Sequence, residues 1–237
     1  MAWTELKDLE SATEKCRRYY DAQYSKSSSY WGEQPNLLVP LISSYLRPDS
    51  RILVVGCGEG RDAIFLARLD FEVVATEISS FGLKRAKEIV SEENGSLVLL
   101  MLDAHEPHDH LGQFDAVLMM NVIQHLSPDL IPDRIGHFKS LVKPGGIFSA
   151  QLFTVEDPHF LSAANSAGGF SRRLTIEHPE RKYRIRFFEK GELRSYFNGW
   201  EMIHYHEGLI WDKPHGVQSD FHQHGMARMI ARRRLGI

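Results

Sequence analysis

Residues 51–60 read Arg51-Ile52-Leu53-Val54-Val55-Gly56-Cys57-Gly58-Glu59-Gly60, an apolar run followed at once by three alternating glycines. The β-branched run predicts a strand that is buried on both faces of a parallel sheet. Glycine permits a tight turn and lets a ligand approach the backbone. Residues 62–69 then predict a helix, whose N-terminus favours electron-rich groups. The stretch therefore predicts a strand–turn–helix unit that holds a ligand at its turn.

Apolar runs and helical patterns alternate along the rest of the chain. The predicted strands cover residues 51–55, 71–75, 97–102, 114–120, 147–153, 200–205 and 225–232. This alternation predicts an α/β fold, a doubly wound and mostly parallel sheet of seven strands, with right-handed crossovers. Further helices are expected at about 2–24, 37–46, 79–93, 127–143 and 190–197. We divide the chain into an N-terminal helical segment (1–46) that covers the ligand site and a main domain (47–237) with a lid insertion at about 155–188.

The spacing of the glycines narrows the kind of ligand. Dinucleotide sites favour Gly-x-Gly-x-x-Gly, whereas Gly56, Gly58 and Gly60 alternate. This spacing resembles motif I of the class I methyltransferases, which implies a Rossmann-like fold and S-adenosyl-L-methionine as the cofactor, released as S-adenosyl-L-homocysteine. Many such enzymes carry an acid two residues before the first glycine, where this chain has Val54.

Polar residues follow the next three predicted strands. Glu77 is placed to accept hydrogen bonds from both ribose hydroxyls, Asp103 to accept one from the adenine amino group, and Asn121 to lie near the methionine part. Open α/β sheets bind ligands at the carboxyl ends of their strands, where all three stand; the alternative is that the two acids are ordinary loop residues. The predicted cofactor-binding residues are Trp31, Gly56, Cys57, Gly58, Gly60, Glu77, Ile78, Asp103, Ala104 and Asn121.

A closer resemblance covers residues 30–237. It is carried by Trp31-Gly32-Glu33-Gln34-Pro35-Asn36, Gly56-Cys57-Gly58-Glu59-Gly60-Arg61, Phe188-Glu189-Lys190-Gly191-Glu192-Leu193-Arg194 and Gly199-Trp200-Glu201. These segments resemble the tellurite-resistance methyltransferases and, more loosely, the thiopurine methyltransferases. The resemblance implies a methyl transfer enzyme with a small-molecule acceptor, and an N-terminal aromatic segment (Tyr30, Trp31) over the cofactor. The alternative for Trp31 is that it packs the N-terminal helix onto the sheet.

Methyl transfer from a sulfonium needs close and aligned reactants more than it needs a catalytic triad. Proximity supplies up to ~7–11 kcal/mol of barrier reduction. A general base helps only where the acceptor loses a proton, so a soft anion such as a thiolate needs none. His125, just beyond the fourth predicted strand, is the candidate base or substrate contact. A structural histidine that packs the following helix is the alternative.

The predicted lid is rich in positive charge. Residues 171–186 hold six positive side chains, Arg172, Arg173, Arg181, Lys182, Arg184 and Arg186, against Glu177 and Glu180. In an extended chain Arg184 and Arg186 share one face. If that face meets the active site, the guanidinium groups favour an anionic acceptor. The alternative is a lid whose charges lie in water.

Composition limits the other function classes. The 237 residues carry a formal charge of −3, which does not favour general nucleic-acid binding. Two cysteines, Cys16 and Cys57, indicate a reducing compartment, and no signal peptide or apolar run of ~20 residues is found. We expect a cytoplasmic monomer or homodimer, with no membrane or nucleic-acid partner. The late histidines (His204, His206, His215, His222, His224) stand near Asp212 and Asp220. Their spacing matches no zinc pattern, so we expect no metal and a loop at the mouth of the site. A metal site is the alternative, since imidazole suits zinc, copper and nickel.

Three other functions compete with methyl transfer. A non-catalytic module that binds S-adenosylmethionine is the main alternative. The basic lid counts against it, because it indicates a second ligand besides the cofactor. A nicotinamide oxidoreductase is disfavoured by the glycine spacing and by the lack of a Tyr-x-x-x-Lys pair. A base-methylating enzyme would carry an Asn- or Asp-Pro-Pro-Tyr motif after the fourth strand, where this chain reads Asn121-Val122-Ile123-Gln124.

Overall fold

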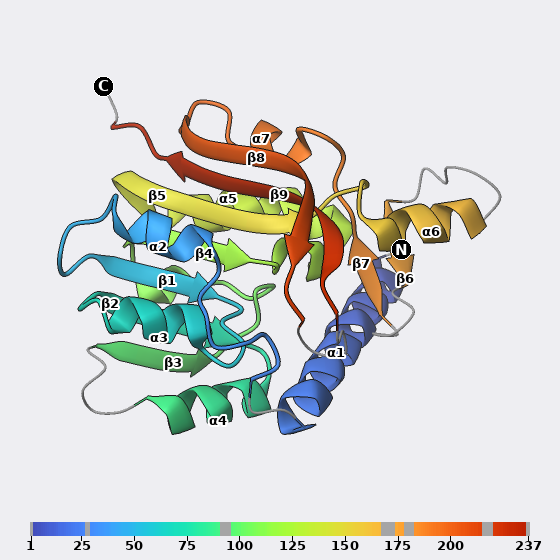
Figure 1. The fold of residues 1–237 in the computed structure, drawn as a ribbon, viewed down its shortest axis with the longest axis horizontal. Helices are drawn as coiled ribbons and strands as arrows, with labels where there is room; N and C mark the ends of the chain where they lie inside the picture. Colours follow the sequence, from blue (N-terminus) through green and yellow to red (C-terminus); the bar gives the residue numbers. More distant parts are fainter. Residues whose placement is uncertain are drawn as a thin grey trace.

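The computed structural model describes residues 2–26, 29–90, 96–166, 174–177, 183–214 and 220–235. Within these residues seven strands form one sheet in the order β3-β2-β1-β4-β5-β9-β8 (Figure 1). The first five strands run parallel, and β9 lies antiparallel between β5 and β8. The strands are β1 (Arg51–Val55), β2 (Glu72–Glu77), β3 (Leu97–Met101), β4 (Phe114–Met120), β5 (Val142–Phe153), β8 (Glu201–Asp212) and β9 (His222–Arg232). The predicted doubly wound, mostly parallel α/β sheet is confirmed.

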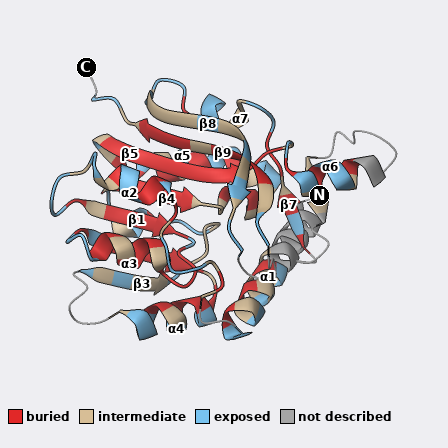
Figure 2. Ribbon diagram, viewed as in Figure 1, coloured by how far each residue is buried: buried red, intermediate tan, exposed pale blue. Residues whose placement is uncertain are grey.

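Helices cover both faces of this sheet (Figure 1). They are α1 (Ala2–Lys26), α2 (Leu38–Ser43), α3 (Arg61–Ala67), α4 (Ser80–Ile89), α5 (Ile131–Ser140), α6 (Pro158–Ser166) and α7 (Glu192–Ser195), with short 3₁₀ turns η1 (Asp109–Leu111), η2 (Ile123–His125) and η3 (Pro128–Leu130). Two apolar clusters result: α2 and α3 pack on one face, and α5 and α7 on the other. The central strands are buried from both sides, whereas β3 and β8 at the edges are partly exposed (Figure 2).

The segment between β5 and β8 leaves the sheet. It contains α6 and a small antiparallel pair of strands, β6 (Thr175–Glu177) and β7 (Arg184–Arg186). Tyr183, Ile185 and Phe187 alternate inward along β7 and pack with Tyr20 and Phe153 in a third apolar cluster. This cluster joins the segment to α1, which lies across the carboxyl ends of the parallel strands (Figure 1).

Some boundaries differ from those predicted. β8 and β9 extend to Asp212 and start at His222, well beyond the predicted 200–205 and 225–232. The two strands pair with each other along this extension. The backbone N–H and C=O groups that face the partner strand are therefore hydrogen-bonded, although many side chains of β8 are partly exposed. β5 likewise begins at Val142, and α7 is shorter than predicted. Among the described residues, no helix combines the length and apolar character needed to cross a bilayer.

Candidate functional site

A cavity of about 540 Å³ opens at the carboxyl ends of β1, β2, β3 and β4. Parallel strands end at the same edge of a sheet, which is where open α/β folds bind ligands. Helix α1 and the segment after it cover the cavity from the other side. Ten predicted site residues line it: Trp31, Gly56, Cys57, Gly58, Glu77, Ile78, Asp103, Ala104, Asn121 and His125.

The glycine turn requires glycine for two different reasons. Gly56 and Gly58 adopt left-handed φ angles of +65° and +58°. A Cβ at Gly56 would lie 2.5 Å from Val122 Cγ2, and one at Gly58 would lie 2.9 Å from the Tyr24 hydroxyl oxygen. Gly56 and Gly58 therefore leave the backbone exposed in the cavity wall, with no side chain over it.

Gly60 has another role, because it is not among the residues that line the cavity. It starts α3 with a φ of +87°, and a Cβ there would lie 2.8 Å from the Cβ of Ala86 in α4. The glycine thus lets α3 and α4 approach each other. Gly60 was predicted as a cofactor contact, and its position instead indicates a packing role.

Glu77, at the end of β2, is only 6% exposed and is tied to the backbone. Its Oε2 accepts a hydrogen bond from Gly58 N at 2.8 Å, and its Oε1 accepts from Ile78 N and Ser79 N at 2.9 and 2.8 Å. Burial raises the pKa of this carboxyl, although the three hydrogen bonds act against the increase. Oε1 already accepts two of these bonds, whereas Oε2 accepts one and keeps a second lone-pair direction for a hydrogen bond from a ligand.

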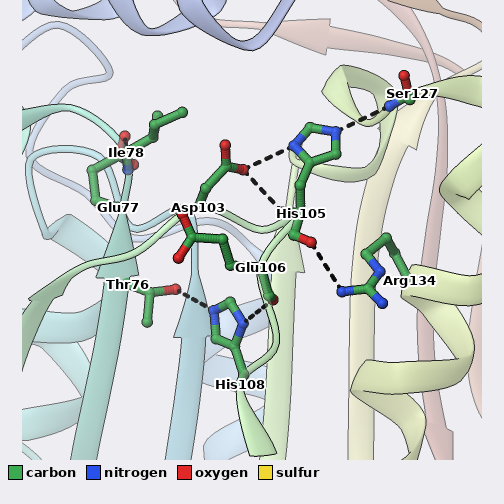
Figure 3. Close-up of polar contacts among 9 residues, drawn as sticks. All are labelled: Thr76, Glu77, Ile78, Asp103, His105, Glu106, His108, Ser127 and Arg134. Atoms are coloured by element: carbon green, nitrogen blue, oxygen red, sulfur yellow. Dashed lines mark hydrogen bonds and ion pairs between the residues drawn. The ribbon is translucent and has the colours of Figure 1, made fainter. Parts of the chain in front are cut away.

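Asp103 follows β3 and forms a pair with His105 (Figure 3). Burial alone would raise the Asp103 pKa, but hydrogen bonds from the His105 ring and backbone outweigh it and hold the pKa below its usual value. Both bonds reach Oδ1, so Oδ2 keeps its acceptor capacity. His105 Nδ1 donates to Asp103 at 2.8 Å, and His105 Nε2 accepts from Ser127 N at 3.2 Å, which fixes the neutral tautomer. Sequence reasoning missed His105.

A second histidine, His108, joins the loop that carries Asp103 to strand β2 (Figure 3). His108 is fully buried; its Nδ1 donates to the Glu106 carbonyl at 2.8 Å and its Nε2 lies 3.4 Å from Thr76 Oγ1. Burial lowers its pKa, which favours the neutral ring. The bond to Thr76 in β2 links the Asp103 loop to the strand that ends in Glu77.

The segment after α1 is fastened over the cavity by residues of the glycine turn and α3. Tyr30 N donates to Glu59 Oε2 at 2.6 Å, and Asn36 N donates to Asp62 Oδ1 at 2.7 Å. Arg61 Nη1 donates to the Trp31 carbonyl at 2.6 Å. The glycine motif therefore positions two parts of the site at once: the bare turn and the aromatic cover.

Tyrosines of α1 complete this cover, and sequence reasoning missed them. Tyr20 and Tyr24 line the cavity, stacked with ring centroids 5.6 Å apart. Trp31 Nε1 donates to the Tyr24 hydroxyl at 3.0 Å. The four-residue spacing of the two tyrosines places them on one helix face. That spacing was the signal available in the sequence.

Asn121 lies where β4 ends, in the left-handed region with a φ of +58°. Few residue types other than glycine tolerate this conformation, and asparagine is one of them. Its Oδ1 accepts from Gln151 Nε2 at 3.2 Å. The turn aims the chain from the sheet into η2, which contains Gln124 and His125.

Gln124 places a buried amide in the cavity wall. It lines the cavity and is 1% exposed. Within the part of the chain that the structure describes, neither atom of its side-chain amide has a hydrogen-bond partner. An unsatisfied buried amide costs about 1–3 kcal/mol, which a bound ligand relieves. Gln124 is a further cavity-lining residue that sequence reasoning did not select.

His125 lies between two tyrosine hydroxyls. Its Nε2 is 3.3 Å from the Tyr20 hydroxyl, and its Nδ1 is 3.4 Å from the Tyr183 hydroxyl. A neutral imidazole donates at one nitrogen and accepts at the other, so this arrangement can pass a proton in either direction.

Arg184 and Arg186 share one face of β7 as predicted, but that face is turned away from the cavity. Arg184 is exposed, and the inward positions are taken by their apolar and aromatic neighbours. Arg186 forms an ion pair with Glu192 at 2.8 Å and lies over the Phe188 ring. Their positions do not support the predicted contact with an anionic acceptor. Four more positive residues, Arg172, Arg173, Arg181 and Lys182, lie outside the described residues.

The predicted loop of late histidines is wrong for three of the five. His206 lies in β8, and His222 and His224 lie in β9. His204 also lies in β8, in agreement with the predicted strand 200–205. His215 lies outside the described residues. One face of an antiparallel hairpin at the edge of a sheet is exposed to water, so its strands can carry as many polar residues as a loop. The polar sequence therefore suggested a loop.

Comparison with known proteins agrees with this geometry. Residues 52–146 match the family model of a methyltransferase domain. The chain is 28% identical over 137 residues to a probable fatty acid methyltransferase of Mycobacterium tuberculosis, covering 57% of this chain and 31% of that protein. It is 21% identical over 159 residues to the probable S-adenosylmethionine-dependent methyltransferase TehB of Haemophilus influenzae, covering 67% and 49%.

Solved structures share the fold. That of TehB from Haemophilus influenzae has a TM-score of 0.67 at 19% identity and covers 84% of this chain and 62% of that one. A Burkholderia thailandensis 1,6-didemethyltoxoflavin N1-methyltransferase, with bound substrate and S-adenosylhomocysteine, has a TM-score of 0.66 at 15% identity and covers 95% and 90%. The chain spans about a third to a half of the length of the two curated relatives. Residues 52–146 therefore match a methyltransferase domain, and the chain is similar in sequence and fold to S-adenosylmethionine-dependent methyltransferases, TehB among them.

Proposed function

We propose that this protein transfers a methyl group from S-adenosylmethionine to a small-molecule acceptor by in-line displacement. The observation that carries the proposal is the cavity itself. It joins a bare glycine turn and two fixed carboxyl groups at one end to the buried Gln124 amide and His125 at the other. A site of this size suits a cofactor together with a small molecule.

The cofactor end fits the nucleoside of S-adenosylmethionine. Glu77, fixed by three backbone N–H groups, would accept hydrogen bonds from the ribose. Asp103 would accept one from the adenine amino group through Oδ2, while His105 holds its Oδ1. Gly56 and Gly58 would let the cofactor lie against the backbone. When bound, the cofactor supplies an electrophilic methyl group on a positively charged sulfur, for which aromatic faces are favourable neighbours.

The acceptor end is neutral and largely aromatic. Cys16, Tyr20, Gln124, His125 and Phe153 line it. We infer that the acceptor is a soft or ionisable nucleophile, such as a thiol or phenol, rather than one held by arginines. Gln124 would orient it, and His125 would take up its proton where it has one to lose. Helix α1, together with β7 and the residues beside it that pack on Tyr20, would exclude water from this end.

The proposal is tested by incubating the full chain with S-adenosylmethionine and a panel of thiols, phenols, carboxylic acids and selenium and tellurium oxyanions. Formation of S-adenosylhomocysteine and a methylated product is followed by mass spectrometry. For a proton-bearing acceptor we expect His125→Asn to lower kcat by about 100-fold or more, with unchanged affinity for S-adenosylhomocysteine. His110→Asn, at an exposed histidine in η1, is the matched control.

Gln124→Ala separates orientation from proton transfer. We expect it to raise KM for the acceptor by roughly tenfold, in line with the loss of one buried hydrogen bond. Tight binding of S-adenosylhomocysteine without turnover of any acceptor would contradict the proposal and favour a non-catalytic binding module.

A further inference from the structure

The β8–β9 hairpin carries three metal-ligating side chains on one face. His222 and His224 are two residues apart on β9, and side chains two apart in a strand share a face. Asp212 on β8 pairs directly with His222, and directly paired residues also share a face. A ring nitrogen of each histidine and a carboxylate oxygen of Asp212 all lie within 4.8 Å of one another.

Both histidines are oriented by oxygen acceptors at Nδ1. His224 Nδ1 donates to Asp157 Oδ2 at 2.9 Å, and His222 Nδ1 donates to the Asp220 carbonyl at 3.0 Å. In the neutral ring this leaves the lone pair on Nε2. Metal-bound histidines almost always donate their other nitrogen to a carboxylate or a carbonyl, and both kinds of support are present here.

Asp157 is itself held rigidly. It is 1% exposed, its Oδ1 accepts from His159 N at 2.9 Å at the start of α6, and its Oδ2 also accepts from Gly225 N at 3.3 Å. Gly225 brings the β9 backbone against the Asp157 turn so closely that a Cβ there would collide with it. The cluster therefore sits on a support that joins β9 to α6.

We propose that Asp212, His222 and His224 bind one divalent transition-metal ion, with Zn²⁺ as the best fit. Two imidazoles and one carboxylate suit such ions, and a site with three protein ligands keeps an open position. A hollow lined by His159, Trp211 and His222 adjoins the cluster and gives that position access to water or a small ligand. The sequence spacing predicts no such site, because nine residues lie between Asp212 and His222, and only the hairpin brings the two together.

The site would fix the hairpin beside the cavity wall. The His224 ring packs on Phe153 with centroids 5.0 Å apart, and Phe153 lines the cavity. Bound metal would hold this wall in place from outside. The inference concerns metal binding alone, so it stands or falls separately from methyl transfer.

The test is calorimetric titration of Zn²⁺ into the chelator-stripped full chain, with Co²⁺ absorption as a second readout. We expect one ion per chain with micromolar or tighter affinity, intense visible Co²⁺ bands of a tetrahedral site, and a higher Tm with Zn²⁺. His222→Ala and Asp212→Asn should each weaken binding by about 100-fold or more, and Asp157→Asn by about 10- to 100-fold.

His206→Ala is the matched control, since it removes an exposed histidine of β8 and should leave binding unchanged. Circular dichroism establishes that each variant is folded before titration. Zn²⁺ affinity weaker than millimolar in the wild-type chain, or equal affinity in the His222→Ala and His206→Ala chains, would overturn the inference.

Discussion

The two ends of the cavity are built in different ways. At the cofactor end, Gly56 and Gly58 follow β1, and Glu77 is the last residue of β2. The Glu77 carboxylate accepts hydrogen bonds from backbone N–H groups of the glycine turn and of the two residues that follow β2. At the acceptor end, side chains from distant segments meet. Tyr20 of α1 and Tyr183 of the 155–188 segment contact His125 from positions 105 and 58 residues away.

The difference indicates where each end tolerates change. The glycine turn and the buried carboxylate tolerate little substitution. A Cβ added at the turn, or the loss of the carboxylate, changes the cavity wall itself. Side chains that meet across segments can be exchanged with less effect on the fold. We therefore expect substitutions at the cofactor end to weaken cofactor binding, and those at the acceptor end to alter turnover.

The largest effect is expected from Gly56→Ala. The new Cβ would lie 2.5 Å from Val122 Cγ2 in a backbone with a φ of +65°, so the turn must move. We expect affinity for S-adenosylhomocysteine to fall by more than about 100-fold, measured by calorimetry.

Gly199→Ala is the matched control for Gly56→Ala. Gly199 has a φ of +83°, yet a Cβ there has no atom within 4 Å among the described residues. It should cost about 1–2 kcal/mol of stability through left-handed strain alone and leave affinity intact. Equal affinity in both glycine variants would refute the assigned role of the turn.

An intermediate effect, on stability alone, is expected from Arg186→Ala. Its ion pair with Glu192 spans 2.8 Å between side chains that are 14% and 17% exposed. Loss of these charge-assisted bonds should lower the free energy of unfolding by about 1–3 kcal/mol, measured by chemical denaturation. Exposed Arg184→Ala should stay within about 0.5 kcal/mol of wild type. A large loss of turnover in Arg184→Ala would instead restore the predicted anion contact.

The smallest effect is a pH dependence at Asp62. Burial raises the pKa of this carboxyl above its ordinary value of 3.8, against the opposing effects of Arg61 and the Asn36 N–H group. The folded state therefore holds the proton more tightly than the unfolded chain does. The resulting stabilisation is full below pH 3.8 and is lost as the pH rises toward the raised folded-state pKa.

Asp62→Asn removes this titration. We expect its free energy of unfolding to fall less steeply than that of wild type as the pH rises above 3.8, measured by urea denaturation at several pH values. Exposed Asp129→Asn is the control. Identical pH profiles for all three chains would show that the pKa of Asp62 is not raised in the folded state.

Most residues predicted at the cofactor end line the cavity, because their signals are local. A strand, a glycine turn and the residue after the next strand are read within about 25 positions, and parallel strand ends bring them together. Gly60 does not line the cavity, and its closeness to Ala86 depends on how α3 and α4 pack, which the glycine spacing does not reveal.

The acceptor end is harder to predict because its contacts are long-range. The inward face of β7 is decided by packing against Tyr20 and Phe153, not by the alternation of Arg184 and Arg186. The pairing of Asp212 with His222 likewise depends on hairpin register, which the polar sequence around it does not reveal.

The most direct test of this account is calorimetric titration of the full chain with S-adenosylhomocysteine, comparing wild type with Glu77→Ala and Glu72→Ala. Glu72 starts the same strand that Glu77 ends, and its side chain is 51% exposed. Micromolar or tighter binding to wild type and Glu72→Ala, weakened about 10- to 100-fold in a folded Glu77→Ala chain, is the expected result. No binding to wild type, or equal binding to all three chains, would contradict the assigned cofactor site.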